Sequence, residues 1–193
     1  MGDVDGSVAG TGTMISVAKK NVLVVILIAA GGLFLLFLVA KEGSRSIKII
    51  HEGDRAPEFR LQALDGRAVS LADFRGKVVM VHFWATWCPP CVEEMPTIEQ
   101  LYRSLGSADF KIIAVSVDEG GAGAVAEFMQ RNGLSLPALL DPGRSVAGLY
   151  GTFKFPETYI IDRRGVVKYK AIGPRNWTAP ANMNVIRELI EAR

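Results

Sequence analysis

Two cysteines are the residues of this chain whose type and spacing most directly indicate chemistry. Cys88 and Cys91 are its only cysteines, and two residues separate them. A disulfide-stapled scaffold needs more cysteines, set farther apart, so the value of this pair must be local and chemical. The pair follows residues 77–84 (KVVMVHFW), a β-branched and aromatic run typical of a buried strand, and precedes a helical segment. This context predicts a redox-active Cys-x-x-Cys pair at the start of a helix.

The two cysteines are expected to have different roles. Free N–H groups and the helix dipole stabilise a thiolate at a helix N-terminus, so we expect Cys88 to attack a substrate disulfide. Cys91, one turn further along and more covered, would then resolve the mixed disulfide. Pro89 and Pro90 lack the N–H groups that could have bonded to the Cys88 thiolate. A less stabilised thiolate makes the pair a weaker oxidant, which favours a reductase over a disulfide-forming oxidase.

Two different interpretations of the cysteines have less support. Half of a structural zinc site would need two more ligands, and the only histidines are His51 and His82, so we expect no metal site. Two inert core cysteines are the second possibility, but the Pro-Pro pair between them argues against a buried position inside a helix. The chain also has no cofactor motif, so no cofactor is expected.

Residues 21–40 (NVLVVILIAAGGLFLLFLVA) form an uncharged apolar run near the N-terminus. As a helix, a run of this length spans about 30 Å, the thickness of the hydrocarbon core of a bilayer. We therefore predict a transmembrane anchor, preceded by a flexible tail (1–20) and followed by a linker (41–50). A cleaved signal peptide is the alternative. Against it, the run is long, and Leu38-Val39-Ala40 lacks the small residue that begins a cleavage site.

The expected location is a bacterial cytoplasmic membrane, with a single span and the catalytic domain in the periplasm or another extracytoplasmic space. A dithiol pair on a membrane anchor suits an oxidising compartment. The flanking charges count slightly against this orientation, because Lys41, Arg45 and Lys48 follow the span while Lys19 and Lys20 precede it. The 22 basic and 20 acidic residues are nearly balanced and form no basic stripe, so nucleic acid is not an expected partner.

Residues 51–193 are predicted to form the globular domain. Two short strands (58–64 and 67–71) flank Asp65-Gly66, a strong hairpin signal. The further predicted strands are 77–84, 110–117, 138–140, 158–162 and 166–171, and the helices are 89–105, 122–131, 144–150 and 179–192, the last with Thr178 as N-cap. This order predicts an α/β fold with a mixed central sheet, helices on both faces and an N-terminal β-hairpin.

The sequence FWATWCPPC, preceded by GKVVMVH and followed by EEMP, resembles the thioredoxin-like family of membrane-tethered reductases, which includes the TlpA, ResA and cytochrome c maturation thioredoxins. The resemblance continues through APEFRLQALDGRAVSLADFRGK, IIAVSVDE and FPETYIIDRRGVV, so it covers roughly residues 54–173. Several motifs in the same order make it specific. It implies a thioredoxin-like fold and thiol–disulfide oxidoreductase activity.

The resemblance also implies roles for residues outside the Cys-x-x-Cys pair. Pro156 matches the family's cis-proline, which helps to bind the substrate chain; from the sequence alone it is only a turn or strand-entry proline. Glu94 matches a glutamate that moves protons near the cysteines, and a solvated helix carboxylate is the alternative. Glu157 is a family-associated acidic residue or an exposed strand end.

Three more residues near the cysteines carry expectations. His82 occupies the strand position where thioredoxin keeps a buried acid, so it is either a proton acceptor for Cys91 or a hydrogen-bonded core histidine. We expect Trp87 to flank Cys88 at the surface and Trp84 to lie in the core.

The favoured function is reduction of disulfides in extracytoplasmic proteins, with apocytochrome c as one candidate substrate. Because the chain has no cofactor motif, a thiol-transferring membrane partner would have to supply electrons. A thiol peroxidase is a competing function, since VSVDE also resembles peroxiredoxins. A second cysteine so close to the first, and no arginine following closely, argue against it. A general disulfide oxidase or isomerase, and a non-catalytic binding or chaperone module, are the remaining candidate functions.

Overall fold

The computed structural model describes residues 22, 26–37, 48–105 and 109–192. The chain divides into two units, Met1–Ser46 and Ile47–Arg193. In the first unit, residues 26–37 are helical and their large apolar side chains are exposed. The predicted tail (1–20), the rest of the predicted anchor except residue 22, and residues 41–47 of the linker lie outside the described residues. Within the described residues, no helix combines the length and apolar character needed to cross a membrane.

The described part of the second unit contains one seven-stranded mixed sheet with the order β2-β1-β5-β4-β3-β6-β7. Strand β3 pairs in parallel with β4, and β4 with β5, while the remaining pairs are antiparallel. The strands are β1 (Arg60–Ala63), β2 (Ala68–Ser70), β3 (Val78–Trp84), β4 (Phe110–Ser116), β5 (Ala138–Leu140), β6 (Glu157–Ile161) and β7 (Val167–Ile172). The predicted mixed sheet and N-terminal hairpin are confirmed.

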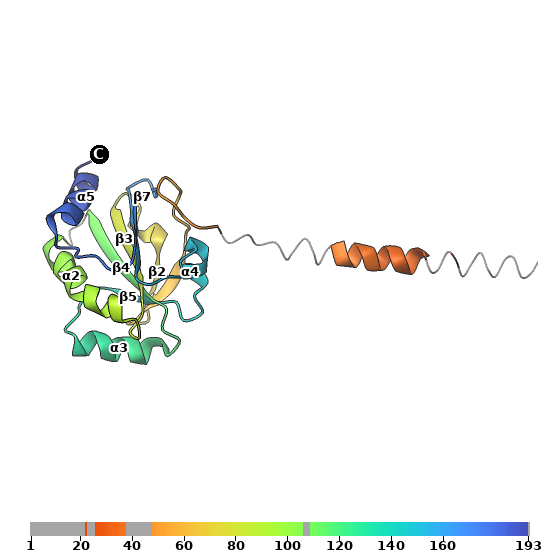
Figure 1. The fold of residues 1–193 in the computed structure, drawn as a ribbon, viewed down its shortest axis with the longest axis horizontal. Helices are drawn as coiled ribbons and strands as arrows, with labels where there is room; N and C mark the ends of the chain where they lie inside the picture. Colours follow the sequence, from red (N-terminus) through yellow and green to blue (C-terminus); the bar gives the residue numbers. More distant parts are fainter. Residues whose placement is uncertain (1–21, 23–25, 38–47, 106–108, 193) are drawn as a thin grey trace, which may run out of the picture. The chain divides into compact units, whose positions relative to one another are not determined.

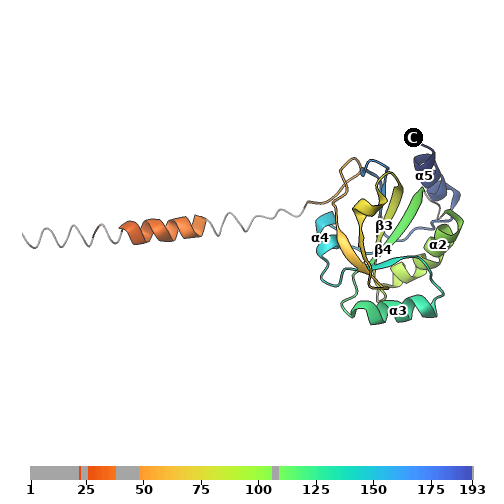
Figure 2. The ribbon, with the colours of Figure 1, turned by 180° about the vertical axis from the view of Figure 1, so that it is seen from behind.

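Helices cover both faces of this sheet. They are α2 (Pro89–Leu105), α3 (Gly121–Arg131), α4 (Ser145–Tyr150) and α5 (Pro180–Glu191), with a short 3-10 helix η1 (Leu71–Phe74) after the hairpin. Helices α2 and α5 lie on one side of the sheet and α4 on the other, in both views (Figures 1 and 2). This is the arrangement of helices on both faces of a mixed sheet that the order of predicted elements implied, and the thioredoxin-like fold that the family resemblance implied.

Strand β3 is the centre of the sheet. All seven of its residues are buried, because β4 and β6 pair with it on either edge and helices cover its faces. A strand that is buried on both faces has apolar residues at consecutive positions instead of alternating ones, which explains the apolar and aromatic composition of β3. Since β3 and β4 are parallel, their carboxyl ends meet at one edge of the sheet. The cysteine segment leaves β3 at that edge.

Two details at the ends of the domain differ from the sequence-based expectations. Ile50, assigned to the linker, is 2% exposed, and its N–H donates to the carbonyl of Tyr150 (3.1 Å). The prediction that Thr178 caps the last helix is wrong. Ala179 is the N-cap residue and makes no side-chain cap. The Thr178 hydroxyl instead donates to Asn176 Oδ1 (2.7 Å), which fixes the turn that leads into α5.

Candidate active site

The two cysteines lie at the junction between β3 and α2 and form a disulfide. Their Cα atoms are 5.3 Å apart, and Cys88 is the residue that immediately precedes the helix. The backbone N–H of Val92 donates to the carbonyl of Cys88 (3.0 Å), so the first helical turn starts at this cysteine. Cys88 is 5% exposed and Cys91 is fully buried. Cys88 is therefore the more accessible of the two cysteines, and Cys91 is the more covered one, as the sequence predicted.

Pro89 and Pro90 are the first two residues of α2. In most helices these positions carry free N–H groups that point toward the residue before the helix. Here both donors are absent because proline has none. The helix end that faces the Cys88 sulfur is therefore poorer in hydrogen-bond donors than an ordinary helix N-terminus.

Asp118 fixes the turn that presents Cys88. This buried carboxylate lies just past the end of β4 and accepts the backbone N–H (3.0 Å) and the hydroxyl (2.5 Å) of Thr86. It also accepts the Ser116 hydroxyl (2.7 Å), and the N–H of Val117 donates to the carbonyl of Trp84 (3.0 Å). The sequence-based interpretation included the VSVDE stretch but assigned Asp118 no role. The available signal was an acidic residue directly after a strand parallel to β3.

Aromatic side chains and one arginine lie around Trp87, the residue before Cys88. Trp87 is 56% exposed and Trp84 is fully buried, as predicted. The Trp87 ring meets Phe155 edge-on (centroids 6.3 Å apart), and the Arg144 guanidinium lies 5.9 Å from the Trp87 centroid. Arg144 has a left-handed backbone (φ 52°), uncommon for a residue other than glycine. The sequence showed no arginine close after Cys88; the fold brings one to the neighbouring residue.

Pro156 follows a cis peptide bond, as the family resemblance implied. The next residue, Glu157, pairs with Phe83 near the carboxyl end of β3. This register places the Phe155–Pro156 turn at the same edge of the sheet as the cysteine segment. The contact between Phe155 and Trp87 independently supports that placement.

Glu94 lies one helical turn after Cys91 and is 2% exposed, so the alternative of a solvated helix carboxylate is wrong. Its Oε1 atom accepts the indole N–H of Trp177. Burial raises the pKa of Glu94 to about 7, although the Trp177 hydrogen bond and the backbone and charge of Arg175 act in the opposite direction. A carboxyl group with this pKa gains and loses a proton near neutral pH, as an acid–base group for thiol chemistry must.

Glu157 is also buried, at 3% exposure, and the alternative of an exposed strand end is wrong. The Lys170 ammonium lies 2.9 Å from Glu157 Oε1, and the Tyr159 hydroxyl donates to the same oxygen (2.8 Å). Lys170 also donates to the carbonyl of Ile50 (2.9 Å). The negative charge of the buried Glu157 carboxylate is thus balanced by the Lys170 ammonium in direct contact with it. These partners tie β6 and β7 to the start of the domain.

His82 is completely buried in β3, and its Nδ1 atom lies 2.9 Å from the Thr158 hydroxyl of β6. Its Nε2 atom has no hydrogen-bond partner among the described residues. Burial lowers the pKa of His82 to about 3, so the ring is neutral at ordinary pH. The hydrogen bond matches the core-histidine interpretation, and the low pKa makes His82 a weak base.

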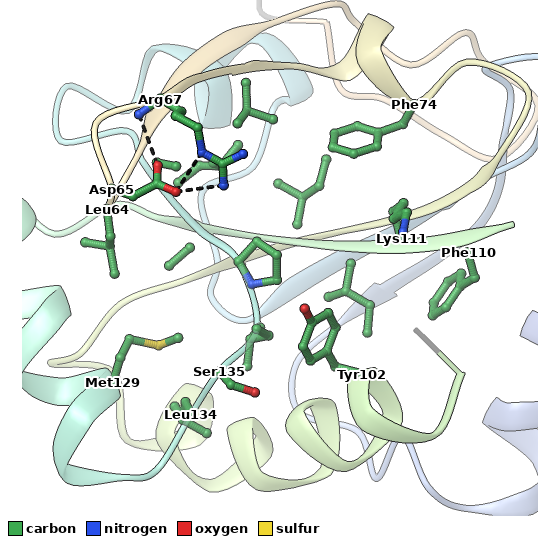
Figure 3. Close-up of a pocket in the computed structure, with 18 residues that line it drawn as sticks. Leu64, Asp65, Arg67, Phe74, Tyr102, Phe110, Lys111, Met129, Leu134 and Ser135 are labelled. Carbon is green, nitrogen blue, oxygen red and sulfur yellow. Dashed lines mark hydrogen bonds and ion pairs between the residues drawn. The ribbon is translucent and has the colours of Figure 1, made fainter. Parts of the chain in front are cut away.

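A pocket of about 610 Å³ lies away from the cysteines (Figure 3). Its wall comes from the β1–β2 turn, with the Asp65–Arg67 ion pair (2.7 Å), and from parts of α2, α3, β4 and β5. Tyr102 of α2 and Lys111 of β4 line it, but no residue from the cysteine segment does. The two cysteines therefore lie outside this pocket.

Comparison with known proteins gives a consistent result. The model of the AhpC/TSA family matches residues 52–170. The chain is 38% identical to the thiol-disulfide oxidoreductase ResA of Bacillus anthracis over 121 residues, which cover 63% of this chain and 69% of that protein. It is 34% identical to ResA of Bacillus subtilis over 149 residues, covering 77% and 80% of the two chains.

Two solved structures resemble this chain over nearly the whole length of the solved chains. A DsbE-like thiol:disulfide interchange protein of Chlorobium tepidum shares 30% identity with a TM-score of 0.67, covering 73% of this chain and 99% of that one. The thioredoxin domain of a thiol-disulfide oxidoreductase from Bacteroides vulgatus shares 25% identity with a TM-score of 0.64, covering 74% and 99%.

Proposed function

The chain belongs to the AhpC/TSA family, among the ResA-type thiol–disulfide oxidoreductases, and we propose that it works as a membrane-anchored reductase of disulfides in extracytoplasmic proteins. It is an enzyme of thiol–disulfide exchange. The observation that carries the proposal is the Cys88–Cys91 disulfide at the start of α2, in which Cys88 is slightly exposed and Cys91 is fully buried.

The proposed reaction starts from the reduced pair. The Cys88 thiolate attacks one sulfur of a substrate disulfide, the substrate S–S bond breaks, and the displaced substrate sulfur leaves as a thiolate. Trp87, the residue before Cys88, contacts Phe155 of the cis-Pro156 turn, and both would contact the substrate chain on either side of its cysteine. Cys88 is the more accessible of the two cysteines, which suits this step because the substrate is a protein and cannot enter a small cavity.

In the second step Cys91 loses its proton and attacks the Cys88 sulfur. The bond between Cys88 and the substrate breaks, the second substrate sulfur leaves as a thiolate, and the Cys88–Cys91 disulfide forms. We assign the acceptance of the Cys91 proton to Glu94, which is buried one turn along the same helix and has a pKa near 7. His82 is assigned a minor role here, because its pKa of about 3 makes it a poor proton acceptor.

The direction of electron flow follows from the missing donors at Pro89 and Pro90. With fewer hydrogen bonds to the Cys88 thiolate, the reduced form is less stabilised, so the pair is expected to give electrons to substrate disulfides. A thiol-transferring partner in the membrane would then return the pair to its reduced form. Apocytochrome c, whose haem-binding cysteines must be free thiols, is the proposed substrate.

The proposed anchor is residues 21–40, with the catalytic domain on the extracytoplasmic side. Support comes from the uncharged apolar composition of this run and from the exposure of the large apolar side chains of residues 26–37. Exposed apolar side chains in a row on a helix are costly in water and favourable in lipid. The anchor would keep the enzyme next to its electron donor.

Trapping tests this proposal. A Cys91→Ala variant, expressed at full length, lacks the resolving thiol, so mixed disulfides with its substrates should persist and be identified by mass spectrometry after non-reducing electrophoresis. The matched control is the double variant with Cys88→Ala, which should trap nothing. A cytochrome or haem-lyase component among the trapped proteins would support the proposed substrate. A folded Cys91→Ala protein that reduces hydrogen peroxide but traps no protein would overturn the proposal in favour of a thiol peroxidase.

A further inference from the structure

We propose that Trp177 is a positioning residue for the proton transfer at Cys91, in which its indole N–H holds one carboxyl oxygen of Glu94 and leaves the other oxygen to exchange the proton. This inference deepens the proposed function and rests on the role assigned there to Glu94. Trp177 lies between β7 and α5, far along the chain from the cysteines, and nothing in its local sequence indicates such a role.

The contacts of Trp177 fix it to the turn of α2 that carries Glu94. Its indole N–H donates to Glu94 Oε1, and its backbone N–H donates to the hydroxyl of Thr97 (3.2 Å). That hydroxyl donates in turn to the backbone carbonyl of Glu94 (2.9 Å). Tyr169 of β7 packs edge-on against the indole, with centroids 6.3 Å apart. The ring is fully buried and held on several sides, so its N–H has one fixed direction.

The two oxygens of Glu94 have different surroundings. Oε1 is bound to Trp177, whereas Oε2 makes no hydrogen bond of good geometry within the part of the chain that the structure describes, although it is buried. A buried oxygen without a hydrogen-bond partner lowers the stability of the fold, and this cost is consistent with a functional role for Glu94 Oε2. Oε2 is the atom free to take the proton from the Cys91 thiol. That transfer leaves the thiolate that attacks Cys88.

The titratable groups of this region come from the segment that carries Trp177, from the cysteine junction with α2, and from β3 and β7. Arg175, in the same segment as Trp177, favours the carboxylate. Cys88 and Cys91 on the junction and helix titrate only when reduced. His82 of β3 is neutral because burial lowers its pKa to about 3, and Tyr169 of β7 contacts the indole. Trp177 is thus the side-chain donor whose loss would change the pKa of the Glu94 carboxyl most directly.

The sign of the expected change follows from the hydrogen bond. The indole N–H stabilises the carboxylate against the desolvation that raises the pKa of Glu94. A side chain of similar size without the N–H would remove this stabilisation. The pKa of Glu94 would rise further above 7, less carboxylate would be present at neutral pH, and Cys91 would lose its proton more slowly.

The experiment measures the rate at which the mixed disulfide is resolved, as a function of pH. Reduced full-length protein is mixed with a short peptide disulfide, the reaction is quenched in acid, and the mixed disulfide is counted by mass spectrometry. The wild-type rate should rise with a midpoint near pH 7. Trp177→Phe should keep this transition but move it to higher pH, with a severalfold slower rate at pH 7. Trp84→Phe is the matched control, because that buried indole has no hydrogen-bond partner among the described residues, and its midpoint should stay at the wild-type pH.

Glu94→Gln separates this inference from the proposed function. If the rate of resolution of the Glu94→Gln variant still rises with a midpoint near pH 7, the role assigned to Glu94 is itself wrong. If Glu94→Gln abolishes the transition but Trp177→Phe leaves the midpoint unchanged or lowers it, the inference about Trp177 is overturned. Should Trp177→Phe not fold, 3-benzothienylalanine at position 177 keeps the ring shape without the N–H and must give the same upward shift.

Discussion

The carboxylate of Asp118 accepts both the backbone N–H and the hydroxyl of Thr86, two residues before Cys88. This pair joins the end of β4 to the turn that leaves β3. The active cysteine is therefore held in place by a contact between two parallel strands as well as by the helix that follows it. The turn that carries Cys88 is thus bonded directly to the segment that follows β4.

Thr86→Val should lower both stability and activity. It removes one hydrogen bond to a buried carboxylate, a contact worth about 1.5–3 kcal/mol, and frees the turn before Cys88. Thr86→Ser keeps both donors and is the matched control. Urea unfolding and the rate of peptide disulfide reduction measure the two effects. Equal behaviour of the Val and Ser variants would show that the Asp118 contact does not position the cysteine.

Pro90→Ala should make the cysteine pair more oxidising. It restores an N–H in the first turn of α2 that can bond to the Cys88 thiolate, and so lowers the pKa of Cys88. A gain of 1.4 kcal/mol for the reduced form corresponds to a rise of about 30 mV in the two-electron midpoint potential. Equilibration with glutathione measures it. Pro96→Ala, in the same helix but further from the sulfur, should leave the potential unchanged.

Lys170→Met should destabilise the domain strongly. It leaves Glu157 buried without its cation, and breaking a buried ion pair from one side costs about 3–5 kcal/mol. Lys168→Met is the control, since Lys168 lies 3.7 Å from Asp162 and is 38% exposed, so its loss should cost about 0–1 kcal/mol. Denaturant unfolding compares the two. Adding Glu157→Gln to Lys170→Met should recover part of the lost free energy of unfolding. If none is recovered, the loss comes from packing and not from the unpaired charge.

Glu94 should make the folded state less stable as pH rises from about 4.5 to about 7. Its folded pKa is raised from 4.5 to about 7, so the folded state binds more protons than the unfolded state within this window. The favourable contribution is complete below pH 4.5 and is lost as pH increases through 7. Comparing the free energy of unfolding of wild type and Glu94→Gln at pH 5 and pH 8 isolates the effect. The wild type should lose more stability than the variant; the reverse order would contradict the raised pKa.

Much of the fold could be predicted from local patterns. The apolar run before Cys88 is a strand because β-branched and aromatic residues suit a surface buried on both sides, and Asp65-Gly66 makes a hairpin because glycine reaches the positive φ (81°) that the turn requires. The cysteine pair at the strand–helix junction follows from the same local order. These features depend on neighbours in the sequence, so the sequence alone determined them.

The tertiary structure decided what surrounds the cysteines. Glu94 accepts a hydrogen bond from Trp177, Glu157 pairs with Lys170, and Arg144 reaches Trp87 from the start of another helix. Each partner comes from a different element, and no periodicity connects it to the residue that it contacts. The charge state of a buried group is set by desolvation and by its nearest partners, and both exist only once the chain has packed.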